Sequence, residues 1–397
     1  MNKSLLIVGA GFGQLPAIKT AASLGLKTIV VDKNPNALGA KAADVFYVID
    51  IISKQEILAI AKKHAVSGIM TMQSDLPVLT IGYVNDALKL TGVTYKVANF
   101  CSNKIEMRKR LAGKSAAQPR FAIISTLEEA EKIAEQIGFP CVFKAPDNSG
   151  SRGVTKVNSI DDIENAFNEA FKYTREDSIL VEEFIEGLEF GAQTFSVNGR
   201  CESVLLHGDI MSEPPYMIPI GHSFPFVLLG QEEKRIAIED IKDAINALGI
   251  MNGPSNVDLI LDKKTNRVKI IEIGARIGAT CLPELIFYHT GIDWVANAIL
   301  NAIGEEVDLT VKYEKPIAAL IIESPKDGIY DGFEIKDAEL HQKALEFEIT
   351  VNKGDKVNIL RKGTDRIGKV LAYGASVDEA EKLVNEIRKS IIIKLRE

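Results

Sequence analysis

Residues 141–154, CVFKAPDNSGSRGV, join a short apolar run to a loop of small and polar residues. The apolar run ends at Lys144, and the loop that follows is rich in Pro, Asp, Asn, Ser and Gly. One interpretation is an ordinary hairpin, with a lysine whose stem lies along apolar surface while its amino group reaches water. The other is a phosphate-binding loop, because glycine backbones approach phosphates closely and a lysine supplies a compact positive charge.

Length and charge limit the classes of protein that the chain can belong to. A chain of 397 residues exceeds one ordinary core, so two or three domains are expected. The net charge of −7, with acids and bases mixed, argues against a nucleic-acid binder but allows a small anionic ligand. No apolar run reaches the roughly 18 residues of a membrane span, so we expect a cytoplasmic protein without membrane contact.

The cysteines and histidines give no sign of a disulfide framework or of a metal site. Cys101, Cys141, Cys201 and Cys281 lie far apart and form no CxxC pair, so we expect reduced thiols in the core. The five histidines show no metal-binding spacing.

The N-terminal segment, residues 4–35, has the pattern of strand, glycine-rich turn, helix and strand. Further strand and helix patterns follow to about residue 72, and this alternation predicts an open parallel sheet. Gly9, Gly11 and Gly13 form the turn, Gln14 stands where a dinucleotide-binding fingerprint has its third glycine, and Asp32 follows about 20 residues on. A turn that lines another cleft is the favoured interpretation, and an NAD-binding domain is the alternative.

Charged residues then recur at the ends of predicted elements. Residues 102–113, SNKIEMRKRLAG, predict a basic helix with Ser102 as its N-cap. The acidic segment VEEFIEGLE, residues 181–189, ends a strand. Asp258 and Glu272 lie on two strands of a predicted antiparallel hairpin, which brings their carboxylates together. Paired carboxylates near phosphates are a usual magnesium site, and two solvated hairpin acids are the alternative.

Four segments, taken in their order along the chain, resemble the ATP-grasp superfamily of carboxylate–amine and carboxylate–thiol ligases. They are the basic helix with Lys104, the strand that ends at Lys144 before DNSGSRG, the segment VEEFIEGLE, and NVDLILD followed by KIIEIGAR. The resemblance extends from about residue 1 to 303, and the segment from about 311 is similar to the C-terminal domain of the L-amino acid ligase and biotin carboxylase branches. It implies an α/β and α+β multidomain protein. A Rossmann-like domain at 1–100 would precede an ATP-grasp domain at 101–310 with a mobile lid at about 115–183, and a small α+β domain at 311–397 would follow.

The resemblance also implies the nucleotide site. Lys104 and Lys144 would contact the phosphates. Glu182 would bind the adenine amino group, and the backbone of Glu183 and Ile185 would bind the edge of the adenine. Glu189 would accept hydrogen bonds from the ribose hydroxyls. The loop residues implied are Ser149, Gly150, Ser151 and Gly153. A solvated helix face is the alternative for Lys104, and a solvated acidic turn is the alternative for the acidic segment.

The same resemblance assigns the metal and the reacting groups. Asp258 and Glu272 would hold Mg²⁺, with Mn²⁺ as another ion that the site can take, and Gly274 in place of the usual Asn leaves a second metal open. Arg276, together with Lys144, would hold the phosphoryl group in transfer, and a structural ion pair is the alternative for Arg276. His207, His222 and Tyr216 would border an amino-acid pocket or form an ordinary surface loop.

The activity implied is an ADP-forming ligase. A carboxylate attacks the γ-phosphate of ATP to give an acyl-phosphate, and an amine then displaces phosphate. The partners are a small carboxylate, first of all an amino acid or a similar acid, and an amine; a homodimer is left open. The alternatives are a biotin-carboxylase-like or purine-pathway enzyme with the same ATP site, and an NAD-linked oxidoreductase.

Overall fold

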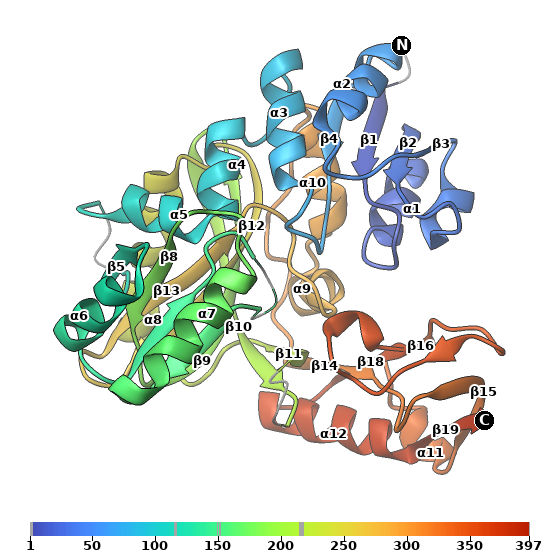
Figure 1. The fold of residues 1–397 in the computed structure, drawn as a ribbon. Helices are drawn as coiled ribbons and strands as arrows, with labels where there is room; N and C mark the ends of the chain where they lie inside the picture. Colours follow the sequence, from blue (N-terminus) through green and yellow to red (C-terminus); the bar gives the residue numbers. More distant parts are fainter. Residues whose placement is uncertain (1–2, 115–116, 149, 151, 214–217, 397) are drawn as a thin grey trace. The chain divides into compact units, whose positions relative to one another are not determined.

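The computed structural model describes residues 3–114, 117–148, 150, 152–213 and 218–396, and the chain divides into two compact units (Figure 1). Unit 1 comprises Met1–Val204, Gly230–Ile277 and Val295–Val307. Unit 2 comprises Leu205–Leu229, Gly278–Trp294 and Asp308–Glu397. In the part of the chain that the structure describes, no helix is both long and apolar enough to cross a membrane.

Unit 1 begins with the predicted parallel sheet, in the order β3-β2-β1-β4. Strand β1 is buried along its whole length, as an apolar strand in the middle of a parallel sheet must be. Helix α1 starts beside Pro16 and ends before Gly25, whose φ of 74° suits a glycine. The elements are β1 (Ser4–Val8), α1 (Leu15–Ser23), β2 (Lys27–Asp32), η1 (Leu38–Ala42), β3 (Val45–Val48), α2 (Lys54–Lys63), β4 (Gly68–Met70) and α3 (Val78–Leu88).

Two helices connect this sheet to the rest of unit 1, and here one prediction was wrong. Helix α4 (Tyr95–Ser102) includes Ser102, so this residue is helical and lacks the extended backbone of an N-cap. Asn103 is extended instead, and its side chain caps α5 (Lys104–Leu111) by accepting from the Glu106 amide.

A four-stranded antiparallel sheet in the order β5-β8-β6-β7 follows, at the position of the predicted lid. Its two amphipathic helices bury a row of Ala and Ile side chains together with Phe143, and Thr126 with Glu129 forms a capping box at the start of α6. The elements are β5 (Phe121–Ile124), α6 (Leu127–Ile137), β6 (Cys141–Lys144), β7 (Val154–Val157), η2 (Ile160–Asp162), α7 (Ile163–Lys172) and β8 (Ile179–Glu183).

Long antiparallel strands complete unit 1, in the order β13-β12-β9-β10. A turn at Asn198-Gly199 joins β9 and β10, with φ of 50° and 82°, as an Asn-Gly pair favours. Strands β12 and β13 form the predicted hairpin, in which Asp258 faces Glu272. The elements are β9 (Gly187–Val197), β10 (Arg200–Met211), α8 (Gln231–Leu248), β12 (Gly253–Asp262), β13 (Arg267–Gly274) and α10 (Trp294–Ala302).

Unit 2 contains the end of β10 followed by β11, β14, β18 and β16, all antiparallel. Helix α12 packs on this sheet through a buried apolar face that includes Val384 and Ile387 (Figure 1). A small sheet, β17-β15-β19, completes the unit. The elements are β11 (Pro219–Phe224), α9 (Leu282–Thr290), β14 (Ile317–Ile322), β15 (Gly328–Ile335), α11 (Ala338–His341), β16 (Glu346–Ile349), β17 (Lys356–Val357), η3 (Gly363–Asp365), β18 (Gly368–Tyr373), α12 (Val377–Ser390) and β19 (Ile391–Arg396).

The predicted mixture of α/β and α+β architecture is confirmed, and the four cysteines are unpaired and buried as expected. The two compact units do not coincide with the three segments drawn from the sequence, since unit 2 takes in residues 205–229 and 278–294. The three-domain division therefore stays a prediction.

Candidate active site

Lys104 connects two segments that are far apart in the sequence. Its Nζ donates to the carbonyl oxygen of Asn148, at 2.7 Å, and to Oε1 of Glu272, at 3.1 Å. The side chain is buried at the first residue of α5, so the alternative of a solvated helix face is wrong for Lys104. One ammonium group thus joins the loop after β6 to the acidic hairpin.

Lys144 is also buried, and its partner is Glu182. Strands β6 and β7 do form an antiparallel hairpin, but the Lys144 Nζ lies 2.6 Å from Oε2 of Glu182 instead of reaching water. The strand register explains this contact, because Glu182 lies diagonally across from Lys144 on the same face of β6 and β8.

Arg108 holds the other oxygen of Glu182. Its Nε donates to Glu182 Oε1 and its Nη2 to the carbonyl of Ile271, at 2.9 Å. Burial alone would raise the pKa of Glu182, but the charges of Arg108 and Lys144 outweigh burial and lower that pKa to about 2. Arg108 was not among the residues predicted for the site. The available signal was its spacing of four residues from Lys104, which puts both on one face of α5.

The loop after β6 has the backbone that its glycines predict. Gly150 and Gly153 have φ of 69° and 70°, and a Cβ on Gly153 would lie 2.8 Å from that of Ala145. The amide of Ala145 donates to the carbonyl of Gly153, which closes the base of the loop. Ser149 and Ser151, the other two predicted loop ligands, lie outside the described residues.

The acidic segment spreads its side chains in different directions. The Glu183 carboxylate accepts from the backbone and side chain of Arg120, and the Glu183 amide donates to the Arg120 carbonyl. An adenine contact from the Glu183 backbone would therefore use its carbonyl oxygen. Ile185 is buried, and Glu189 is exposed on β9 opposite Ile260.

The acidic hairpin presents two carboxylates of different exposure. Asp258 is exposed and Glu272 is half-buried beside Lys104. Asn256, two residues before Asp258, donates to Asp258 Oδ1 at 2.9 Å and accepts from the buried amide of Gln193 at 2.6 Å. This chain of amides orients the Asp258 carboxylate.

Arg276 is paired with a residue that sequence analysis missed. Its Nε and Nη2 donate to the two carboxylate oxygens of Asp75, at 2.7 and 3.0 Å. Burial opposes the charged form of both groups, but their mutual attraction raises the pKa of Arg276 and lowers that of Asp75. Asp258 and Glu272 also raise the pKa of Arg276, and Lys104 also lowers that of Asp75, so the five charges form one cluster.

Asp75 reaches the cluster because residues 72–77 follow β4 at the carboxyl edge of the parallel sheet. Met72 forms an isolated parallel bridge with Ile277, and the Gln73 amide donates to the Ile277 carbonyl. Ligands of open α/β sheets bind outside this edge, so an acidic residue just after a strand was a usable signal.

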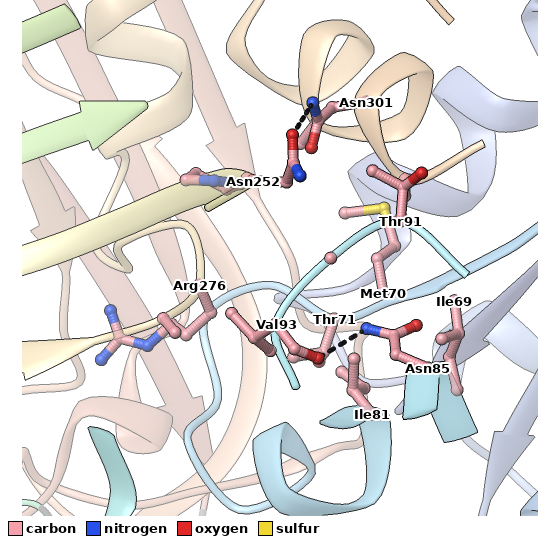
Figure 2. A pocket seen from close by; sticks show the side chains of 16 residues that line it. Ile69, Met70, Thr71, Ile81, Asn85, Thr91, Val93, Asn252, Arg276 and Asn301 are labelled. Carbon is pink, nitrogen blue, oxygen red and sulfur yellow. Dashed lines mark hydrogen bonds between the residues drawn. The ribbon is translucent and has the colours of Figure 1, made fainter. Parts of the chain in front are cut away.

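A cavity of about 50 Å³ lies behind Arg276 (Figure 2). The guanidinium of Arg276 points away from the other labelled side chains. Apolar side chains and the amides of Asn85, Asn252 and Asn301 line the space, and Asn85 Oδ1 has no hydrogen-bond partner among the residues that the structure describes. Nucleotide-sized pockets measure about 300–1,000 Å³, so this cavity is too small to be the nucleotide site.

Backbone amides of the glycine turn after β1 are occupied by side chains of this chain, Gln14 and Asp32. Gln14 accepts from the Gly11 amide and donates to the Met72 carbonyl, and Asp32 accepts from the Ala10 amide at 2.8 Å. A dinucleotide needs an open approach to these glycines and a free acid for its ribose. The arrangement therefore disfavours the NAD alternative.

The remaining candidates lie in unit 2. His207 and His222 are buried on β10 and β11, so an exposed surface loop is the wrong interpretation for both. Tyr216 lies outside the described residues.

Comparison with known proteins identifies two segments of the chain. Residues 137–284 match the ATP-grasp domain, and residues 321–396 match the L-amino acid ligase C-terminal domain 2. A formate-dependent phosphoribosylglycinamide formyltransferase of Saccharolobus solfataricus is 26% identical over 99% of this chain and 98% of that protein.

Solved structures agree over the full length. A crystal structure of phosphoribosylglycinamide synthetase from Anaerococcus prevotii is 29% identical with a TM-score of 0.84, and covers 100% of both chains. The L-amino acid ligase of Bacillus licheniformis shares the fold, with a TM-score of 0.82 and 21% identity over 100% of this chain and 99% of that one. The chain therefore contains an ATP-grasp domain at residues 137–284, and over its full length it has the fold of phosphoribosylglycinamide synthetase and L-amino acid ligase.

Proposed function

We propose that this enzyme activates a small carboxylate as an acyl-phosphate and joins it to an amine, releasing ADP and phosphate. A carboxylate oxygen attacks the γ-phosphorus of ATP, and the bond to the β-phosphate oxygen breaks. The amine nitrogen then attacks the acyl carbon, phosphate leaves with the acyl C–O electron pair, and the amine loses a proton. An amino acid or a similar acid is the favoured acyl donor, because residues 321–396 match a domain of L-amino acid ligases.

The observation that carries this proposal is the position of Lys104 between the loop backbone and the acidic hairpin. A triphosphate needs a cation, backbone N–H groups and a metal within one small volume. Lys104 brings together the loop that would supply the N–H groups and the carboxylate that would supply the metal ligand.

The donor set at the hairpin fits Mg²⁺. Asp258 and Glu272 face each other across β12 and β13, and Mg²⁺ prefers one or two carboxylates together with phosphate oxygens and water. These two residues would hold the ion, which neutralises phosphate charge when bound. Hard oxygen donors also accept Mn²⁺, so we expect Mn²⁺ to replace it.

Nucleotide binding is assigned to the groups around Glu182. An ammonium group has three N–H donors, so the Lys144 contact with Glu182 leaves donors for phosphate. Glu182, Ile185 and the carbonyl of Glu183 would meet the adenine, and the exposed Glu189 would accept from the ribose hydroxyls. Gly150 and Gly153 would let the loop backbone approach the phosphates.

Arg276 is assigned to the phosphoryl group in transfer. Its bidentate pair with Asp75 fixes the guanidinium in the same charge cluster as Asp258 and Glu272. A positioned guanidinium stabilises charge on phosphoryl oxygens without reorganisation during the reaction. Asp75 would position Arg276 in this role.

A substrate screen tests the proposal directly. The enzyme is incubated with Mg·ATP and pairs of amino acids, ADP release is measured, and mass spectrometry identifies the condensed product. We expect ADP release only when carboxylate and amine are both present, with a product of their summed mass less one water. ATP turnover only with bicarbonate would contradict the proposal.

A purine-pathway ligase is the second candidate, because the phosphoribosylglycinamide enzymes match this chain over nearly its full length. The same screen includes phosphoribosylglycinamide with formate. Formylation of that substrate, with no product from amino acids, would favour the second candidate. The subunit number, a monomer or a homodimer, is determined by light scattering on the same sample.

A further inference from the structure

We propose that His207, Asp209 and His222 in unit 2 form a binding site for a divalent transition metal of the Zn²⁺ class, separate from the magnesium site. The histidines show no metal-binding spacing along the sequence, because the third ligand comes from a neighbouring strand. The proposal is independent of the substrate of the ligase.

Strand geometry puts the three side chains on one face. His207 and Asp209 are two residues apart on β10, and alternate residues of a strand point to the same side. Asp209 is the direct cross-strand partner of His222 on β11. An H-x-D pair on one strand and a histidine opposite it therefore converge by the register alone.

The distances are close to those of a metal site. Nδ1 of His207 lies 3.0 Å and Nδ1 of His222 lies 2.7 Å from the same oxygen, Oδ1 of Asp209. Ligand atoms around a tetrahedral Zn²⁺ with bonds of about 2.0–2.1 Å are roughly 3.3 Å apart. Small rotations of the side chains would make that room, and the two imidazole rings already converge, with centroids 4.9 Å apart.

The burial of the three side chains also suits a metal site. His207 and His222 are almost fully buried, whereas Asp209 is partly exposed. The cluster is therefore enclosed by protein but accessible to solvent at Asp209.

The donor set distinguishes this site from the acidic hairpin. Two imidazole nitrogens and one carboxylate are typical of Zn²⁺ sites, whereas Mg²⁺ selects oxygen ligands. Three protein ligands leave a fourth position for water or another donor. The competing explanation is purely structural: the carboxylate accepts hydrogen bonds from both histidines and no metal binds.

Cobalt spectroscopy on the full chain decides between the two. Protein treated with a chelator and desalted is titrated with Co²⁺, whose visible bands are intense in tetrahedral sites. We expect one equivalent to give such bands and one equivalent of Zn²⁺ to abolish them. Wild-type protein that gives no tetrahedral bands would overturn the proposal without any variant.

Variants then locate the ion. His222→Gln should remove the bands and weaken Zn²⁺ binding. Loss of a group that only orients a metal ligand lowers affinity about 10- to 100-fold, and loss of the ligand His222 itself should lower it by more. Glu272→Gln, at the magnesium site, and His64→Gln, a histidine paired with Tyr47 in unit 1, should leave both unchanged. Bands lost in Glu272→Gln but kept in His222→Gln would place the ion at the hairpin and refute the site.

Circular dichroism checks that His222→Gln is folded. Asp209→Asn serves as the second variant, since it keeps the size of the side chain and removes the charge. Tetrahedral Co²⁺ bands that survive in both folded variants would also refute the assignment.

Discussion

Glu182 is buried between two cations, and each of its carboxylate oxygens has its own partner. Arg108 takes one oxygen and Lys144 the other. Such a buried arrangement contributes little net energy when complete, but it costs much when one partner is removed, because the others stay buried without compensation. The same carboxylate therefore keeps Lys144 in place and holds α5 against β8.

Glu182→Gln should destabilise the protein and weaken nucleotide binding. Two buried cations would lose their counter-charge, and breaking a buried pair costs about 3–5 kcal/mol. Urea unfolding measures this loss and ADP titration the binding. Glu186→Gln is the matched control, because Glu186 lies on the same segment but pairs with Lys263 at the exposed surface. Equal stability of the two variants would contradict the role given to Glu182.

The same contact predicts a pH dependence. The Glu182 pKa falls from 4.5 to about 2 on folding, which corresponds to about 3 kcal/mol. This stability is present above about pH 4.5 and is lost as the pH falls toward 2, since the unfolded carboxyl then binds a proton first. Unfolding free energies between pH 6 and 2.5 should fall more steeply for the wild type than for Glu182→Gln.

Arg276→Ala should slow the reaction more than it weakens nucleotide binding. Removing a donor to a developing charge costs about 10²–10³ in kcat, whereas ADP affinity should stay within about twofold if Arg276 meets only the group in transfer. Turnover and ADP binding are measured on one preparation. Parallel losses in both would indicate that the Asp75–Arg276 pair is structural only.

The loop between β6 and β7 contains two glycines with positive φ, Gly150 and Gly153. Gly150 and Gly153 share a positive φ, but their surroundings differ: a Cβ on Gly150 meets open space, and one on Gly153 meets Ala145 and Tyr173. Asn148 also stabilises the base of the loop, because its side-chain amide donates a hydrogen bond to the Tyr173 carbonyl. The base is therefore fixed, while Gly150 lies in open space.

Gly153→Ala should raise the KM for ATP and lower stability more than Gly150→Ala. Both variants carry the backbone strain of about 1–2 kcal/mol that an L-residue meets at positive φ, and only Gly153→Ala adds a steric clash. Steady-state kinetics and thermal unfolding compare the pair. A larger effect of Gly150→Ala would show that this packing does not set the loop conformation.

The hairpin of β12 and β13 is proposed to serve as the metal-binding element at one end only. Glu272→Gln should raise the Mg²⁺ concentration needed for half-maximal turnover by about tenfold or more, since one anionic ligand is lost and Lys104 loses its carboxylate. Asp240→Asn breaks the pair with Arg267 at the other end and is the control. Normal turnover of Glu272→Gln at low Mg²⁺ would refute the metal assignment.

For the whole molecule, the question is which nucleotide the chain stabilises. Mg·ADP should raise the unfolding temperature, because a ligand at 100 times its Kd adds about 2.7 kcal/mol. NAD should give no shift, since Gln14 closes the glycine turn. Differential scanning fluorimetry compares the two. Stabilisation by NAD alone would restore the oxidoreductase alternative.

Periodicity and glycine placement allowed the first parallel sheet and the hairpin of β12 and β13 to be predicted, because strand and helix patterns are local properties of the chain. The pattern also drew attention to Lys144 at the end of an apolar run and to Asp258 and Glu272 on a predicted hairpin, whereas Lys104 was implied by the resemblance to the ATP-grasp superfamily. Local prediction was wrong for Ser102, which ends α4 while Asn103 caps α5, and for the surface-loop interpretation of His207 and His222, which lie buried on strands.

The sequence by itself predicted the parallel sheet near the start of the chain and the facing of Asp258 and Glu272. Only the tertiary structure decided which charges meet: Arg276 with Asp75, 201 residues away, Glu182 with both Arg108 and Lys144, and two histidines with Asp209. The reason is physical. Secondary structure follows from neighbours along the chain, whereas the partner of a buried charge is set by the packing of distant segments, because an unpaired charge cannot stay buried.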